Sequence, residues 1–274
     1  MSEFAELRVR AHSPERWEEV LARVGLVAKG VSFGLVGVLA IGLAAGIGGG
    51  EATSREGALH QLAGNTFGEI VLVLLTAGFA AYALWRIVQA VRAHEDGAAK
   101  TWGKRAGYLG RAAIYVALAY STAKIVAGAG SSGSSNGKAH KATAVALSWP
   151  AGTWLVGAAG LAIIGVGVWN LYRGLTRKFE DKWVGSRSDT AQRWGGYAGV
   201  AGHVARFVVF SLIGVFAVKA ALDYNPKDAV GLDGALQRLV HQSYGPALLG
   251  LTAAGLVAYA IFCFVDARYR DPTA

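Results

Sequence analysis

Long stretches without a charged side chain are the feature that most constrains this chain. Residues 31–50, 70–85, 142–172 and 239–265 contain no Asp, Glu, Lys or Arg. A helix rises about 1.5 Å per residue, so roughly 20 apolar residues cross the ~30 Å hydrocarbon core of a bilayer. These four stretches are close to that length or exceed it. The sequence therefore predicts at least four transmembrane helices.

Two shorter apolar stretches, 112–123 and 207–218, are interpreted as further spans because of their flanks. Arg111 and Lys124 bound the first stretch, and Arg206 and Lys219 bound the second. Long cationic side chains reach toward the headgroups, which lengthens a short span at each end. We therefore expect an all-α integral membrane fold with six transmembrane helices, at residues 24–47, 67–90, 106–128, 151–174, 200–222 and 245–267.

Composition and charge distribution agree with a membrane protein. Only 16% of the residues are charged and 53% are hydrophobic, which leaves too few charges to cover a soluble enzyme of this size. The net charge of +9 would suit a nucleic-acid partner, but the cations flank the apolar stretches, so no such partner is expected. With a cytoplasmic N-terminus, 20 of the 27 Lys and Arg residues lie on the inner side. This bias predicts a bacterial plasma-membrane protein with both termini in the cytoplasm.

The chain also contains three copies of one pattern. The motif Gly-x-x-(Ala/Gly)-(Lys/Arg) begins at Gly25, Gly107 and Gly202, and an aromatic residue follows each cation by four positions. The even-numbered spans align as well, because a glycine precedes an aromatic residue by 17 positions in each of them. These pairs are Gly68 and Trp85, Gly152 and Trp169, and Gly245 and Phe262. One membrane domain, residues 1–274, is therefore expected to hold three tandem two-helix repeats, at about 14–96, 98–180 and 190–270.

Three helix pairs that open with this motif and close near Tyr82-Ala-Leu-Trp-Arg86 resemble a bacterial membrane-protein family, the domain of unknown function 1206. The resemblance extends from about Trp17 to Arg270. It implies the repeated architecture and no established activity. Asn170 and Cys263 occupy the position of Arg86 in the second and third copies, so Arg86 cannot serve a role that all three copies share.

The leading candidates for a binding site are Lys29, Arg111 and Arg206, which occupy the same position in the three repeats. A cation inside a span is costly and marks a functional hypothesis. If the repeats surround a pseudo-threefold axis, the three side chains could converge on an anion or a lipid phosphate. The alternative is that they serve as topological anchors. Lys124 and Lys219 are expected to be snorkelling cations at the outer ends of their helices.

Several segments outside the spans also carry expectations. Ser13-Pro14-Glu15 is typical of a helix start and predicts an amphipathic surface helix that leads into the first span. Residues 175–183 are expected to form an interfacial extension that contacts lipid or covers the protein's own apolar surface. Residues 128–141 are expected to form a flexible outer loop. The Gly30-x-x-x-Gly34 spacing favours close helix packing.

Catalytic and metal-binding patterns are missing from the sequence. Its histidines lack the i, i+4 spacing of a helical metal site, and no paired carboxylates lie within one span. We therefore expect no enzyme, no cofactor and no metal. The favoured function is a structural or accessory role that binds membrane lipid or a membrane-protein partner. The alternative is a small-solute transporter or channel with its site on the pseudo-threefold axis.

Overall fold

The structure is a computed structural model that describes residues 16–46, 66–93, 98–128, 135–183, 190–240 and 243–270. Over these residues the chain is helical and forms no strand; an isolated bridge joins Trp183 to Arg270. The hydrocarbon core offers no water to the backbone, so the N–H and C=O groups of a spanning segment must bond to one another. A helix satisfies them within one segment. The all-helical fold expected from the apolar stretches is confirmed.

Six long helices correspond to the six expected spans. They are α2 (Arg16–Ala44), α4 (Thr66–Arg92), α5 (Ala98–Val126), α7 (Gly152–Leu175), α8 (Thr190–Leu222) and α10 (Gly245–Tyr269). Five of them, all but α5, are long and apolar enough to cross a membrane, as judged over the described residues. Helix α5 is as long as α2 but carries five cations, which makes it the most polar of the six.

Two short helices, α6 (Ser135–Leu147) and α9 (Leu232–Val240), precede α7 and α10 in equivalent positions of their repeats. They contact one another, and the 3-10 turn η3 (Pro226–Asp228) packs beside α6. Asn136 accepts a hydrogen bond from the backbone N–H of Gly231 at 3.2 Å, which fixes α6 to the chain segment before α9. The expectation of a flexible loop was therefore wrong for residues 135–141, because tertiary contacts hold them in a helix. Residues 129–134 of that loop lie outside the described part.

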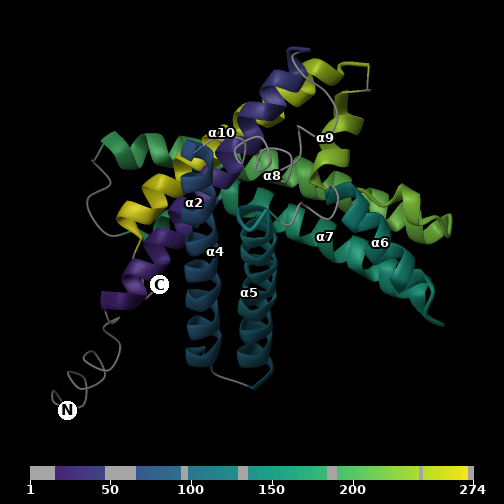
Figure 1. The fold of residues 1–274 in the computed structure, drawn as a ribbon, viewed down its shortest axis with the longest axis horizontal. Helices are drawn as coiled ribbons and strands as arrows, with labels where there is room; N and C mark the ends of the chain where they lie inside the picture. Colours follow the sequence, from purple (N-terminus) through teal and green to yellow (C-terminus); the bar gives the residue numbers. More distant parts are fainter. Residues whose placement is uncertain are drawn as a thin grey trace.

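The long helices form an incomplete ring, in which each helix packs on the next. The order of neighbours is α5, α4, α2, α10, α8 and α7. Helices α5 and α7, which belong to the same repeat, share no extensive contact. In Figure 1, α5 runs alongside α4 whereas α7 is inclined to both of them. We call this arrangement the helix ring and the missing contact its open side.

The core of the ring lies where α2 and α8 pack on α10. Val36, Val209 and Leu256 are buried there together. Gly30 and Gly34 face α10, since a Cβ added to either would meet Ala260. The Gly30-x-x-x-Gly34 spacing thus provides close internal packing, as the sequence favours.

The structure makes two expectations about interfacial segments more specific. Helix α2 is continuous from Arg16, so its amphipathic first turns and its span form one helix; Ser13-Pro14-Glu15 lies outside the described residues. Helix α7 ends at Leu175, and the following turn carries Phe179 into the protein interior, where the ring is fully buried. Phe179 stacks on His203 with ring centroids 5.1 Å apart. This segment therefore covers the protein's own apolar surface at that position.

Candidate anion-binding site

Two cations from different repeats meet on one tyrosine. The Nζ of Lys29 on α2 lies 5.0 Å from the ring centroid of Tyr259 on α10. Arg206 on α8 donates from Nη1 to the Tyr259 hydroxyl at 2.6 Å, and its guanidinium carbon lies 4.6 Å from the same ring. Both cations are half-buried. The packing of α2 and α8 on α10 therefore brings together residues 177 positions apart in the sequence.

A third cation, Arg86, extends this group on the side of α4. Its guanidinium donates to the hydroxyl of Tyr82, one turn earlier, and its carbon lies 4.4 Å from the ring of Trp85. Lys29 also lies 6.0 Å from the Tyr82 ring, so the ammonium is shared between Tyr82 and Tyr259. Arg86 is only 7% exposed. We refer to Lys29, Arg86 and Arg206 as the cationic cluster.

The cationic cluster lacks a carboxylate partner among the described residues. The nearby acid, Asp266, is occupied: it pairs with Arg270 at 2.7 Å and accepts from the indole N–H of Trp183 at 2.9 Å. The Nε atoms of Arg86 and Arg206 are shielded from solvent and have no hydrogen-bond partner. Buried charges are normally paired, and a buried donor without an acceptor is costly. The cluster is thus chemically incomplete and suited to an anion.

Arg111, the third of the repeated cations, is placed differently. It is exposed on α5, and its guanidinium lies 5.9 Å from the ring of Tyr108 on the same helix. It remains close enough to Arg86 and Arg206 to interact with them electrostatically. The structure thus joins Lys29 and Arg206 through a shared tyrosine, and it leaves Arg111 at the edge of the group, on the helix that borders the open side.

Sequence reasoning missed Arg86, Tyr82 and Tyr259 as members of the site. Arg86 was set aside because the other repeats lack it. A signal was nonetheless present: the aromatic residues that align the even-numbered spans, Trp85 and Phe262, each follow a tyrosine by three positions. Residues three apart lie on the same helix face. This spacing marks a shared aromatic face in the first and third repeats.

The two cations expected at the outer ends have partners of their own. Lys219 forms ion pairs with Asp223 at 3.0 Å and with Asp228 at 3.1 Å. The ammonium of Lys219 lowers the pKa of the Asp228 carboxyl below its ordinary value of 3.8. Lys124 lies 5.8 Å from the ring centroid of Tyr120 on the same helix.

Within the part of the chain that the structure describes, histidine and acidic side chains do not gather into a second site. His203 is buried in an aromatic cage of Phe179, Tyr259 and Phe262, and its Nδ1 lies 2.7 Å from the carbonyl oxygen of Gly199. Among the described residues, no group of three or more His, Cys, Asp or Glu side chains is placed to hold a metal ion.

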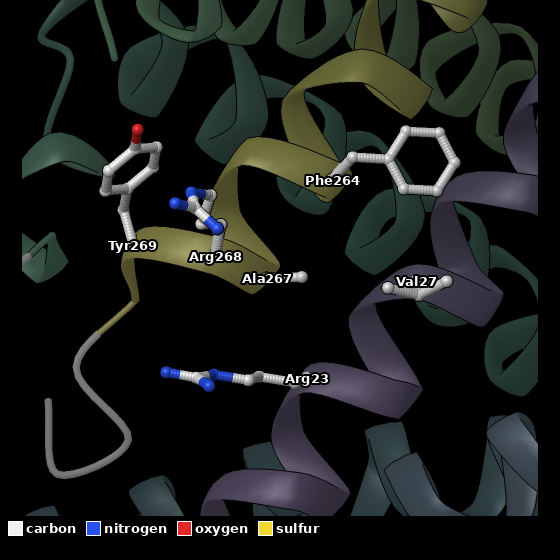
Figure 2. A pocket seen from close by; sticks show the side chains of 6 residues that line it. All are labelled: Arg23, Val27, Phe264, Ala267, Arg268 and Tyr269. Atoms are coloured by element: carbon white, nitrogen blue, oxygen red, sulfur yellow. The ribbon is translucent and has the colours of Figure 1, made fainter. Parts of the chain in front are cut away.

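A second basic surface lies outside the helix ring, between α2 and α10. Figure 2 shows this open groove of about 530 Å³, where Arg23 of α2 and Arg268 of α10 flank a floor that includes Val27 and Phe264. Arg23 already pairs with Glu19 one turn earlier. The groove is open, and its cations are less enclosed than those of the cationic cluster.

Long apolar helices, internal repeats and exposed apolar side chains define a multi-pass membrane protein. Comparison with known families gives a more specific assignment. The model of the Domain of Unknown Function DUF1206 matches the chain three times, at residues 24–93, 106–177 and 201–270. The chain belongs to this family.

A relative from Bacillus subtilis (strain 168), the uncharacterized protein YxxB, is 31% identical over 260 residues. The match covers 94% of this chain and 93% of the relative. No solved structure matches the chain. The three matched segments coincide with the three helix pairs that the repeated motif predicts.

Proposed function

We propose that this protein is a non-catalytic component of the bacterial plasma membrane that binds the phosphate of an anionic lipid in its cationic cluster. The observation that carries the proposal is the convergence of Lys29, Arg86 and Arg206 without a carboxylate among the described residues. Guanidinium groups bind phosphate through paired hydrogen bonds, and a lysine adds a compact charge. The Nε–H groups of Arg86 and Arg206 still lack an acceptor, which a bound phosphate would supply.

In this proposal α5 is the sixth span, and both termini are cytoplasmic. Its place in the repeat supports the assignment, because α5 carries the same motif as α2 and α8, and both of these are apolar enough to span. The order of neighbours supports a pseudo-threefold arrangement of the repeats. Each repeat contacts the next one through the same pair of helices: α4 with α5, α7 with α8, and α10 with α2.

Lipid is favoured over a soluble anion because the helices of this protein expose large apolar side chains. The described helices expose large apolar side chains, including Leu74, Ile114 and Leu161, at more than half of their area. Such surfaces suit acyl chains. Arg111, exposed beside the open side of the helix ring, offers an intermediate contact for a headgroup that enters from the bilayer.

The test is native mass spectrometry of the full chain in mild detergent with phosphatidylglycerol as the probe. Arg86→Gln combined with Arg206→Gln should weaken phosphatidylglycerol binding by about tenfold or more, since each charge-assisted hydrogen bond contributes about 1.5–3 kcal/mol. The matched control, Arg23→Gln with Arg268→Gln, removes the same charge from the groove of Figure 2 and should leave binding unchanged. Loss of binding in the groove variant alone would place the lipid there and refute the proposal.

One observation favours a soluble anion as a second candidate ligand. Lys29 of the first repeat and Arg206 of the third repeat meet on Tyr259, where α2 and α8 pack on α10. A substrate site at the interface between repeats is typical of a transporter. Uptake of inorganic phosphate into proteoliposomes, abolished by Arg206→Gln, would support transport in place of lipid binding.

A further inference from the structure

The first and third repeats pack their two helices through the same close contact. A Cβ added to Gly25 on α2 would lie 2.5 Å from the Cβ of Tyr82 on α4, and a Cβ added to Gly202 on α8 would lie 2.5 Å from the Cβ of Tyr259 on α10. The glycine of the repeated motif therefore allows the backbone to approach the tyrosine of its partner helix. Both tyrosines are 2% exposed.

A second pair of small residues completes this contact about one turn further along. Ala28 on α2 meets Gly78 on α4, and Ala205 on α8 meets Gly255 on α10. All four residues are buried. The contact is thus the same in two repeats that are otherwise different in sequence.

The second repeat has the equivalent positions but not the contact. The motif glycine is Gly107 and the small residue after it is Gly110; a Cβ added to either would meet nothing within 4 Å. On α4 and α10 the contacting residues lie three and seven positions before the aligned aromatic residues Trp85 and Phe262. The same positions before Trp169 on α7 are Val166 and Ala162. Both of these are exposed, Val166 to 48%. Positions that are buried in two repeats are therefore exposed in the third.

We propose that α5 and α7 pack on each other through these residues in a second, closed conformation of this chain. Gly110 then contacts Ala162 and Gly107 contacts Val166, which repeats the geometry of the other two pairs. Small residues on both helices allow the close approach that drives helix association in hydrocarbon. This contact would close the helix ring, because all of its other adjacent helix pairs already pack on each other.

Closure also explains the different surroundings of the three repeated cations. Lys29 and Arg206 are half-buried because their helices pack on the even helix of the same repeat, whereas Arg111 is exposed. Packing of α5 on α7 would enclose Arg111 as the equivalent cations are enclosed. The open and closed forms thus differ in the exposure of Arg111. The helix contact itself does not depend on anion binding.

The second repeat differs from its counterparts in a way that explains why it opens. Val166 replaces the tyrosine found at the equivalent position of α4 and α10. Valine offers less contact area than tyrosine and no hydroxyl for the neighbouring cation. The α5–α7 contact is therefore expected to be the weakest of the three and to separate first.

Cysteine cross-linking in native membranes tests the closed form. Cys263, the one cysteine of the sequence, is first replaced by alanine, and then Gly110→Cys and Ala162→Cys are introduced together. Neither new side chain meets an obstacle, because Gly110 has open space and Ala162 is exposed. Mild oxidation should then link the two cysteines within one chain. The matched control, Val116→Cys with Ala162→Cys, places the thiol on a different face of α5 and should not form the link.

The products distinguish the outcomes. A linked product of monomer size supports closure within the chain. A linked dimer would show that the α5 face packs on α7 of a second copy and would overturn the proposal, as would the absence of any link. Phosphatidylglycerol binding is measured separately, so a failure of closure leaves the proposed lipid site standing and a failure of lipid binding leaves closure standing.

Discussion

At the scale of single residues, aromatic rings take the role that carboxylates usually have beside buried cations. Tyr259 presents its ring to Lys29 and accepts a hydrogen bond from Arg206 with its hydroxyl. A ring face attracts a cation electrostatically, and this attraction is strongest away from water. Because the rings are neutral, they position the cations without cancelling their charge. The positive potential of the cationic cluster is therefore preserved for a ligand.

Tyr259→Phe is a specific test of this arrangement. The ring remains but Arg206 loses its hydroxyl acceptor, so the variant should be less stable by about 1.5–3 kcal/mol, the usual size of a hydrogen bond to a charged group. The measurement is thermal unfolding in detergent. Tyr120→Phe, at an exposed site on α5, is the control and should unfold like the unmodified chain. Equal stability of Tyr259→Phe would mean that the hydroxyl contributes nothing.

At the scale of helices, the decisive feature is how closely the two helices of a repeat approach. The same motif glycine lies in a tight contact at Gly202 and in open space at Gly107. Helices in hydrocarbon gain little from burying apolar side chains, so close packing of small residues determines which pairs associate. The motif therefore encodes a contact, and the partner helix decides whether it forms.

The matched substitutions Gly202→Ala and Gly107→Ala separate these two situations. The methyl group at position 202 would overlap Tyr259, so the variant should lose about 1–3 kcal/mol of stability, as overpacked cores do. The methyl group at position 107 meets nothing, and alanine stabilises a helix interior by about 0.5–1 kcal/mol relative to glycine. Thermal unfolding of the two variants in one detergent gives the comparison. A similar loss in both would contradict the open position of Gly107.

The sequence predicted the positions of the long helices well, but it predicted some of their ends poorly. The predicted spans 151–174 and 245–267 differ from α7 and α10 by at most two residues at each end. Helix α5, in contrast, begins at Ala98, eight residues before the predicted span. The apolar stretch marks the hydrocarbon boundary, whereas backbone hydrogen bonds continue the helix beyond it. Residues 135–141 of helix α6 were predicted as a loop because the Gly- and Ser-rich stretch that leads into them resembles one, and the contacts of α6 with α7 and α9 depend on the tertiary structure.

At the scale of the whole molecule, the cation bias predicts which face of the bilayer each short segment occupies. A single cysteine at Lys178, after α7, should lie in the cytoplasm, and one at Ala139, in α6, should lie outside. In a Cys263→Ala background, an impermeant maleimide should label Ala139→Cys in intact cells. It should label Lys178→Cys only after permeabilisation. The reversed pattern would refute the proposed orientation.

The sequence by itself determined the class of the protein, its six long helices and its threefold repetition, because hydrocarbon permits few backbone arrangements and each span must satisfy its own hydrogen bonds. It also located three repeated cations. Only the tertiary structure decided that Arg86, Tyr82 and Tyr259 join Lys29 and Arg206, and that Arg111 remains apart. The reason is physical: a periodic pattern defines the face of one helix, but the neighbour of that face depends on how closely two distant backbones can approach.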